Sequence, residues 1–158
     1  MDVQDAVVED HFDAVRVPDG VLVRMSRNVE ATLARQIAEL IRFLAEDVVP
    51  ERRGLRRTAA AVERRLFPDA YRTRVDSADL RARHRDRLRD TGPATRVAAQ
   101  CLAGSPFVLD ENGVDDWIGT IGLLRMLRPP RERRLSSVNG RWYTHIQTLL
   151  VLAVDPRA

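Results

Sequence analysis

The feature that most constrains this chain is the apolar stretch from Leu109 to Leu127, because it joins a clear helix start to a helix with little polar surface. Asp110 stands at the N-cap position, and Leu109 and Val114 flank it at the spacing of a hydrophobic staple. Apolar residues then recur at three- and four-residue spacing, at Val114, Trp117, Ile118, Ile121, Leu124 and Leu127, with Leu123 and Met126 widening the stripe. Such a helix must be covered on most sides, so the stretch predicts the central helix of a mainly α-helical domain.

Polar and small residues within this stretch carry more specific expectations. Gly119 and Gly122 each cost about 1 kcal/mol relative to alanine in a helix interior, so we expect another helix to come close at these positions. Arg125 lies at the edge of the apolar stripe, where its guanidinium needs a partner, and a structural ion pair is expected there. Asp115 and Asp116 suit the helix dipole and, being adjacent, do not face each other as a catalytic pair would.

A β-hairpin is predicted near the start of the chain, at about residues 12–25. Two short β-branched runs flank Pro18-Asp19-Gly20, which reads as a three-residue turn. This turn pairs Val17 with Val21 and Val15 with Val23, which places four valines on one face. A lone ribbon cannot bury such a face, so we expect the hairpin to lie against the helices.

Helical periodicity extends over most of the remaining chain. The expected helices cover about residues 28–48, 56–66, 77–90, 93–103, 111–128 and 141–154. In the first helix, the apolar stripe lies opposite Arg35, Glu39, Arg42 and Glu46. The last helix is apolar nearly all round, so we expect it to pack beside the central helix. The predicted fold is therefore one mainly α domain, residues 1–158, built as a bundle of about six helices with an N-terminal two-stranded hairpin.

Composition restricts both the compartment and the chemistry. No apolar run approaches the length of about eighteen residues that a membrane helix needs, and the acidic N-terminus is unlike a signal peptide. The single cysteine, Cys101, is expected to be a small buried hydrophobe in a reducing compartment. We therefore expect a cytoplasmic protein with no membrane partner. The 26 basic residues are all arginines, which excludes Schiff-base and P-loop lysine chemistry.

No catalytic or metal-binding pattern is visible in the sequence. His11, His84 and His145 are far apart and none has metal-ligand spacing, while Cys101 has no second cysteine to form a zinc pair. His84 is expected to be a partly buried structural histidine. Nucleophile-elbow, dinucleotide-binding and phosphate-loop motifs are also absent. The sequence therefore predicts a non-enzymatic protein, with no catalytic residue, no metal and no cofactor.

Charge is distributed unevenly along the chain. Residues 1–50 hold 5 arginines and 10 acids, residues 51–96 hold 14 and 7, and residues 97–158 hold 7 and 6, so the net charges are −5, +7 and +1. The candidate interaction surface is the basic middle third, namely Arg52, Arg53, Arg56, Arg57, Arg81, Arg83, Arg85, Arg87 and Arg89. Three aspartates interrupt the second group, so a solvated face, a protein-binding face and a phosphate-binding face all remain open. The acidic and basic thirds can either neutralise each other within one molecule or meet across a two-fold interface. We expect a weak, salt-sensitive homodimer, or dimerisation displaced by an acidic partner, rather than a strict monomer.

Five segments together resemble one known family. They are the hairpin followed by VEATLARQIAEL, the segments RRLFPDAY and ADLRARHRDRL, the block VLDENGVDDWIGTIGLLRMLR, and YTHIQTLLVLAVDP at the end. The chain is similar, over about residues 12–156, to an actinobacterial family catalogued as domain of unknown function twenty-seventeen. Genes of that family typically lie beside the gene of the Clp-protease adaptor ClpS, and some relatives carry a label as transcriptional regulators. The resemblance implies a cytoplasmic helical protein linked to regulated proteolysis. The family has no established catalytic residues that could be assigned to positions of this chain.

The sequence thus leads to two main functional hypotheses, with an enzyme assembled from scattered Asp, His and Tyr residues as a third. The first is a non-enzymatic interaction or regulatory module whose partner is the Clp machinery or a second copy of the chain. The alternative is a nucleic-acid-associated transcriptional regulator that uses the nine arginines of the basic middle third.

Overall fold

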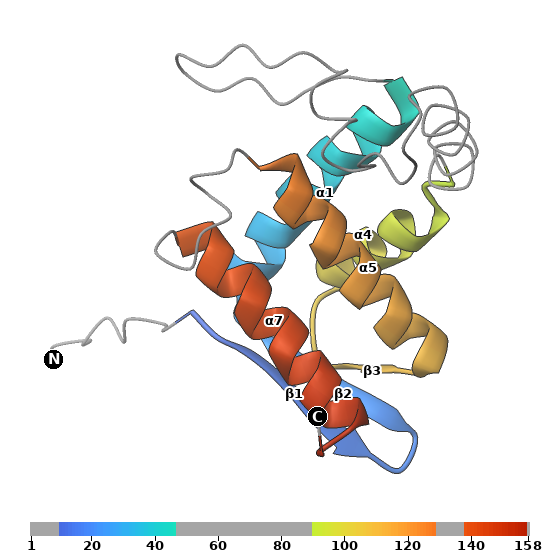
Figure 1. The fold of residues 1–158 in the computed structure, drawn as a ribbon, viewed down its shortest axis with the longest axis vertical. Coiled ribbons are helices and arrows are strands. Elements are labelled where there is room, and N and C mark those ends of the chain that lie inside the picture. Colours follow the sequence, from blue (N-terminus) through green and yellow to red (C-terminus); the bar gives the residue numbers. More distant parts are fainter. Residues whose placement is uncertain (1–9, 47–89, 129–137, 158) are drawn as a thin grey trace, which may run out of the picture.

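The fold was analysed in a computed structural model, which describes residues 10–46, 90–128 and 138–157. These residues form four helices and one three-stranded antiparallel sheet (Figure 1). In chain order the elements are β1 (Phe12–Val17), β2 (Gly20–Met25), α1 (Arg27–Glu46), α4 (Gly92–Ala103), β3 (Phe107–Leu109), α5 (Glu111–Leu127) and α7 (Val138–Val154). Helix α7 packs on β1 and α5, and α4 packs between α1 and α5. None of the described helices is long and apolar enough to cross a membrane.

The predicted bundle of about six helices with a two-stranded hairpin is wrong. In the described residues a third strand, β3, pairs antiparallel with β2, through Val21 with Leu109 and Val23 with Phe107. A strand of three residues is too short to show period-two alternation, and its partner lies far away in the sequence, so no local signal predicted it. The expected helix at 56–66 lies outside the described residues. So does the expected helix at 77–90, except for Asp90, which is not helical.

The predicted register of the hairpin is also wrong by one residue. Gly20 belongs to β2 and pairs with Val17, so the turn has two residues, and Val23 pairs with Ala14. Val21 and Val23 face the core as expected, whereas Val15 is 49% exposed on the opposite face of the sheet. Burial of Phe12, Ala14 and Met25 on the inner face accounts for this register, because a shift of β1 by one residue would turn Phe12 and Ala14 outward while Met25 stayed inward.

A glycine is required at position 20 because strand β3 comes close to the backbone there, which the turn sequence alone did not predict. Its φ angle is +144°, which side chains rarely tolerate, and a Cβ atom there would overlap the carbonyl group of Leu109. The close approach of β3 to the start of β2 therefore depends on a glycine at this position.

The centre of the core is α5, and its N-cap is as predicted. Asp110 Oδ1 accepts a hydrogen bond of 2.7 Å from the Gly113 N–H, and both residues of the predicted staple are buried. Trp117 is fully buried, with its Nε1–H donating to Gln100 Oε1 at 2.6 Å. Its ring centroid lies 5.9 Å from that of Phe12 and 5.8 Å from that of Phe107. The tryptophan thus joins α4, α5 and the sheet in one apolar cluster.

The expectation that Gly119 and Gly122 admit a neighbouring helix is wrong for the first and only weakly met for the second. A Cβ atom at Gly119 would have nothing within 4 Å, and one at Gly122 would meet the Gln147 side-chain amide of α7 at 3.6 Å. Gln147 Nε2 donates to the Ile118 carbonyl at 3.3 Å. Helix α7 therefore reaches α5 here through a side chain rather than through a close backbone crossing.

A buried polar network fastens α1 to α5 and α7. Arg128, 1% exposed at the end of α5, donates from Nη2 to Glu39 Oε2 at 2.9 Å and from Nε to the Tyr143 hydroxyl at 3.2 Å. That hydroxyl donates to Gln36 Oε1 at 2.7 Å, and Gln36 Nε2 donates to Asn139 Oδ1 at 3.3 Å. The structural ion pair that the sequence predicted at Arg125 is formed instead by Arg128, three residues later and close to one helical turn away.

Candidate functional site

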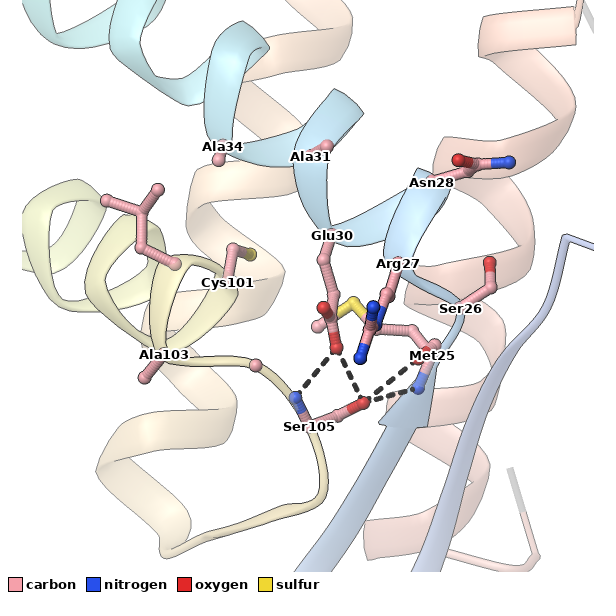
Figure 2. Close-up of a pocket in the computed structure, with 12 residues that line it drawn as sticks. Met25, Ser26, Arg27, Asn28, Glu30, Ala31, Ala34, Cys101, Ala103 and Ser105 are labelled. Atoms are coloured by element: carbon pink, nitrogen blue, oxygen red, sulfur yellow. Dashed lines mark hydrogen bonds between the residues drawn. The ribbon is translucent and has the colours of Figure 1, made fainter.

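An open depression lies between the N-terminal half of α1 and the C-terminal half of α4, with a volume of about 1040 Å³ (Figure 2). We call it the α1–α4 groove. Its lining consists of Met25, Ser26, Arg27, Asn28, Glu30, Ala31, Ala34, Cys101, Leu102, Ala103, Gly104 and Ser105. Half of the lining residues from the two helices, Ala31, Ala34, Cys101 and Ala103, have short side chains. Leu102, on the α4 side, is 78% exposed.

One end of the groove is closed by hydrogen bonds around Ser105. Its N–H donates to Glu30 Oε1 at 2.7 Å, and its hydroxyl lies 2.8 Å from the same oxygen (Figure 2). The hydroxyl also accepts from the Met25 N–H and lies 3.0 Å from the Met25 carbonyl. These bonds tie the end of β2 and the first turn of α1 to the loop before β3. The hydrogen bonds of the hydroxyl to the Met25 backbone and to Glu30 hold these segments together, and among the described residues no histidine contacts it, so we interpret the cluster as structural.

Cys101 forms part of the groove floor but is a poor nucleophile. It is 3% exposed, as the sequence predicted. Burial, helped by the negative charge of Glu30, raises the pKa of the Cys101 thiol to about 12. The thiolate is the reactive form, so this thiol is inert at physiological pH. Among the described residues, no group of His, Cys, Asp and Glu side chains could hold a metal ion.

The outward side of α1 carries a second feature, which we call the α1 basic face. It consists of three exposed arginines alternating with three exposed alanines, namely Arg27, Ala31, Arg35, Ala38, Arg42 and Ala45. At 3.6 residues per turn these positions fall within an arc of about 80°. Arg27 and Ala31 also line the groove, so the two features are continuous. Within the described part of the chain, none of the three arginines forms a hydrogen bond or an ion pair.

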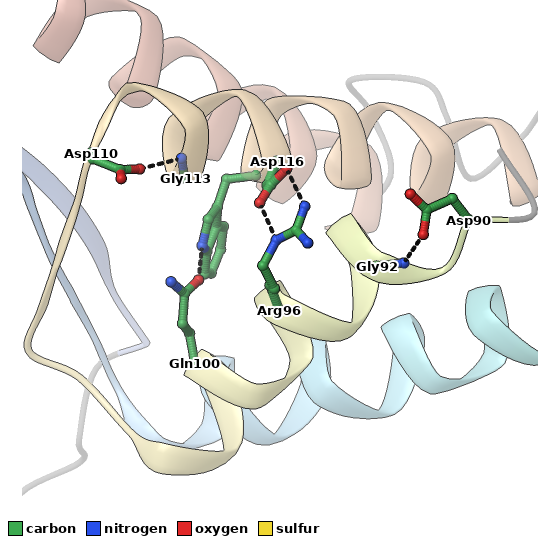
Figure 3. Close-up of polar contacts among 8 residues, drawn as sticks. Asp90, Gly92, Arg96, Gln100, Asp110, Gly113 and Asp116 are labelled. Carbon is green, nitrogen blue, oxygen red and sulfur yellow. Dashed lines mark hydrogen bonds and ion pairs between the residues drawn. The ribbon is translucent and has the colours of Figure 1, made fainter. Parts of the chain in front are cut away.

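The neighbouring α4–α5 surface shows the opposite arrangement. Arg96 of α4 binds Asp116 of α5 through two hydrogen bonds, of 2.8 Å from Nε and 3.2 Å from Nη2 (Figure 3). The hydrogen bond to Asp116 raises the pKa of Arg96. Figure 3 also shows Asp90 accepting from the Gly92 N–H at the start of α4. Arg96 and Asp116 thus link α4 to α5. The arginines of the α1 basic face form no such bond with any described residue.

The nine arginines predicted as an interaction surface lie outside the described residues: Arg52, Arg53, Arg56, Arg57, Arg81, Arg83, Arg85, Arg87 and Arg89. His84 lies outside them as well. Of the other two histidines, His145 places Nε2 at 3.3 Å from the Phe12 carbonyl. Sequence reasoning identified Arg35 and Arg42 only as the polar side of a helix. The alternation of arginine and alanine at helical spacing was the signal that could have identified the α1 basic face.

Comparisons with known proteins place the chain in a family without assigning an activity. No curated protein and no solved structure gave a match. A family model matches residues 9–131, which is most of the chain and includes α1, α4, the sheet and α5. The chain therefore belongs to the family described as Domain of unknown function (DUF2017).

Proposed function

We propose that this protein is a non-enzymatic interaction module that binds a protein partner through the α1–α4 groove and the α1 basic face. The observation that supports this most is that Arg27, Arg35 and Arg42, beside an open depression, form no ion pair or hydrogen bond with any described residue. Arginine is enriched in protein interfaces because its planar guanidinium combines apolar stacking with directional hydrogen bonds. The exposed Leu102 adds an apolar anchor at the same site.

The cellular partner that we propose belongs to Clp-dependent regulated proteolysis. This part of the proposal is supported by the resemblance to a family whose genes lie beside that of ClpS, which is an association and not a contact. The same resemblance supports our proposal that the protein is cytoplasmic. The other candidate protein partner is a second copy of the chain, which the crosslinking experiment below also detects.

Nucleic acid is the competing partner, because arginines that lack carboxylate partners can also neutralise phosphates. The α1 basic face has alanines between its arginines and no aromatic side chain on which a base could stack. This composition favours a protein partner over a single strand.

Site-specific photocrosslinking in the host cell tests the proposal. A photoreactive amino acid at Ala38 probes the α1 basic face, and the same residue at the exposed Thr148 of α7 is the matched control. We expect protein adducts from position 38 that are missing from position 148, identified by mass spectrometry and scored for Clp components and for the chain itself. Adducts to nucleic acid from position 38 would favour the alternative function, and equal adducts from both positions would refute the assignment of this face.

A further inference from the structure

We infer that the α1 basic face binds an acidic amphipathic helix of the partner protein. This inference rests on the proposed function and adds the chemical class of the binding element. The face is a side of a long helix that no described element covers, and its charge has one sign along most of its length.

The spacing of the arginines matches carboxylates on a second helix. Arg27 and Arg35 are eight residues apart, and Arg35 and Arg42 are seven residues apart. At 1.5 Å per residue these separations are about 12 Å and about 10.5 Å along the α1 axis. A partner helix with an acidic residue once in every heptad presents its carboxylates about 10.5 Å apart. Each carboxylate can therefore reach one arginine when the two helices run side by side.

The alanines between the arginines permit the helices to approach closely. Ala31, Ala38 and Ala45 are all exposed and carry only a methyl group. Helix axes separated by 8–10 Å require short side chains at the contact when the distance is near the lower limit. An apolar side chain of the partner can then enter the α1–α4 groove beside Ala34 and the exposed Leu102.

The acidic residues of α1 set the register of the partner. Glu39 pairs with Arg128, and Glu30 Oε1 is held by Ser105, so neither cancels the arginines directly. Glu30 Oε2 and the exposed Glu46 remain to repel a misplaced carboxylate. A helix with acids opposite the three arginines and a neutral or basic residue opposite Glu30 fits the face, whereas a uniformly acidic chain fits it less well.

Fluorescence anisotropy with synthetic peptides tests this inference on the full chain. The probe is a labelled alanine- and leucine-rich helical peptide of about 22 residues with glutamate once per heptad, and its matched control has lysine at the same positions. We expect the glutamate peptide to bind at least about tenfold more tightly than the lysine peptide, with a preference that weakens as salt is raised. Equal binding of both peptides would overturn the inference.

Charge reversal gives a second readout on the same assay. The double variant Arg35→Glu/Arg42→Glu should reverse the peptide preference, while Arg141→Glu, an exposed change on α7, should leave it unchanged. If the double variant does not fold by circular dichroism, Arg42→Gln alone should weaken binding of the glutamate peptide severalfold. Displacement of the peptide by duplex DNA at lower concentration than by unlabelled peptide would overturn the inference in favour of a phosphate-binding face.

The outcomes also separate this inference from the proposed function. If position 38 forms protein adducts in cells but the peptides show no charge preference, only the acidic helix is wrong. If the adducts are missing as well, the proposed function fails with it.

Discussion

The inner and outer sides of α1 differ in how their polar groups are satisfied. On the inner side, Gln36 accepts from the buried Tyr143 hydroxyl and Glu39 accepts from the buried Arg128. On the outer side, Arg35 and Arg42 have no partner that the structure describes. A group with a buried partner cannot be removed without a cost in folding free energy, whereas an exposed unpaired group can. The comparison thus separates residues that maintain the fold from residues that are free to bind.

The largest loss of stability is expected in the core. Trp117→Ala should lower the free energy of unfolding by about 3 to 5 kcal/mol, because truncation leaves a cavity between α5 and the sheet and removes the partner of Gln100. Urea unfolding measures this loss. A change below about 1 kcal/mol would show that the interior is not closed as described.

Cys101 of α4 tests whether the floor of the α1–α4 groove is closed, because it lines the groove and yet is buried. With its pKa raised to about 12, the thiolate fraction near pH 8 is roughly a thousandfold below that of a free thiol. Alkylation by iodoacetamide should therefore be slower by about that factor in the folded protein than in urea. Because the unfolded thiol ionises first, the contribution of Cys101 to stability should be constant below about pH 8 and be lost as the pH rises toward 12, and a Cys101→Ala variant should lack this change. Equal alkylation rates in the folded and the unfolded protein would show that the Cys101 thiol is accessible to solvent in the folded state.

The buried ion pair should respond unequally to loss of its two members. Glu39→Ala should lower the free energy of unfolding by about 3 kcal/mol, because it leaves Arg128, whose side chain is 2% exposed, without its carboxylate partner. Arg128→Met should cost only about 1 kcal/mol, because the Glu39 side chain is 35% exposed and water can reach it. The two urea midpoints give the comparison. A larger loss for Arg128→Met would mean that packing, and not charge burial, dominates at this site.

The smallest change in stability is expected at Gly119, on the exposed surface of α5. Gly119→Ala should raise stability by about 0.5 to 1 kcal/mol, because the added methyl meets nothing within 4 Å and alanine favours the helix. Gly113→Ala is the matched control, since its Cβ atom would lie 3.2 Å from Asp110 Oδ1 and 3.2 Å from Leu109 Cδ2, and it should give no gain. Destabilisation by Gly119→Ala would indicate a contact on this surface that the described residues do not show.

The parts of the fold that the sequence predicted are those specified by local signals. The start of α5 follows from Asp110 and its staple, which lie within a few residues of one another, and the burial of Trp117 follows from helical spacing. Strand β3 was missed because Phe107–Leu109 becomes a strand only through pairing with β2. The hairpin register was missed for a similar reason, because Gly20 is fixed by the approach of Leu109 and not by the turn.

The candidate site was harder to predict than the fold. Periodicity identified Arg42 as exposed, but an exposed arginine is uninformative until the structure shows whether a carboxylate pairs with it. Spacing placed the ion pair at Arg125, yet it is Arg128 that continues the buried row of Ile121 and Leu124 and reaches Glu39. Both errors concern contacts between segments that are far apart in the sequence.

The most direct test of the binding role of α1 is the yield of photocrosslinked protein from position 38 in three backgrounds with matched urea midpoints. These are the natural sequence, Arg35→Glu/Arg42→Glu, and the control Arg141→Glu. Surface changes of this kind should alter stability by no more than about 0.5 kcal/mol. The yield should fall at least about tenfold in the double variant alone, as expected when several charged contacts reverse sign. Equal yields in all three backgrounds would show that α1 does not bind the partner through these arginines.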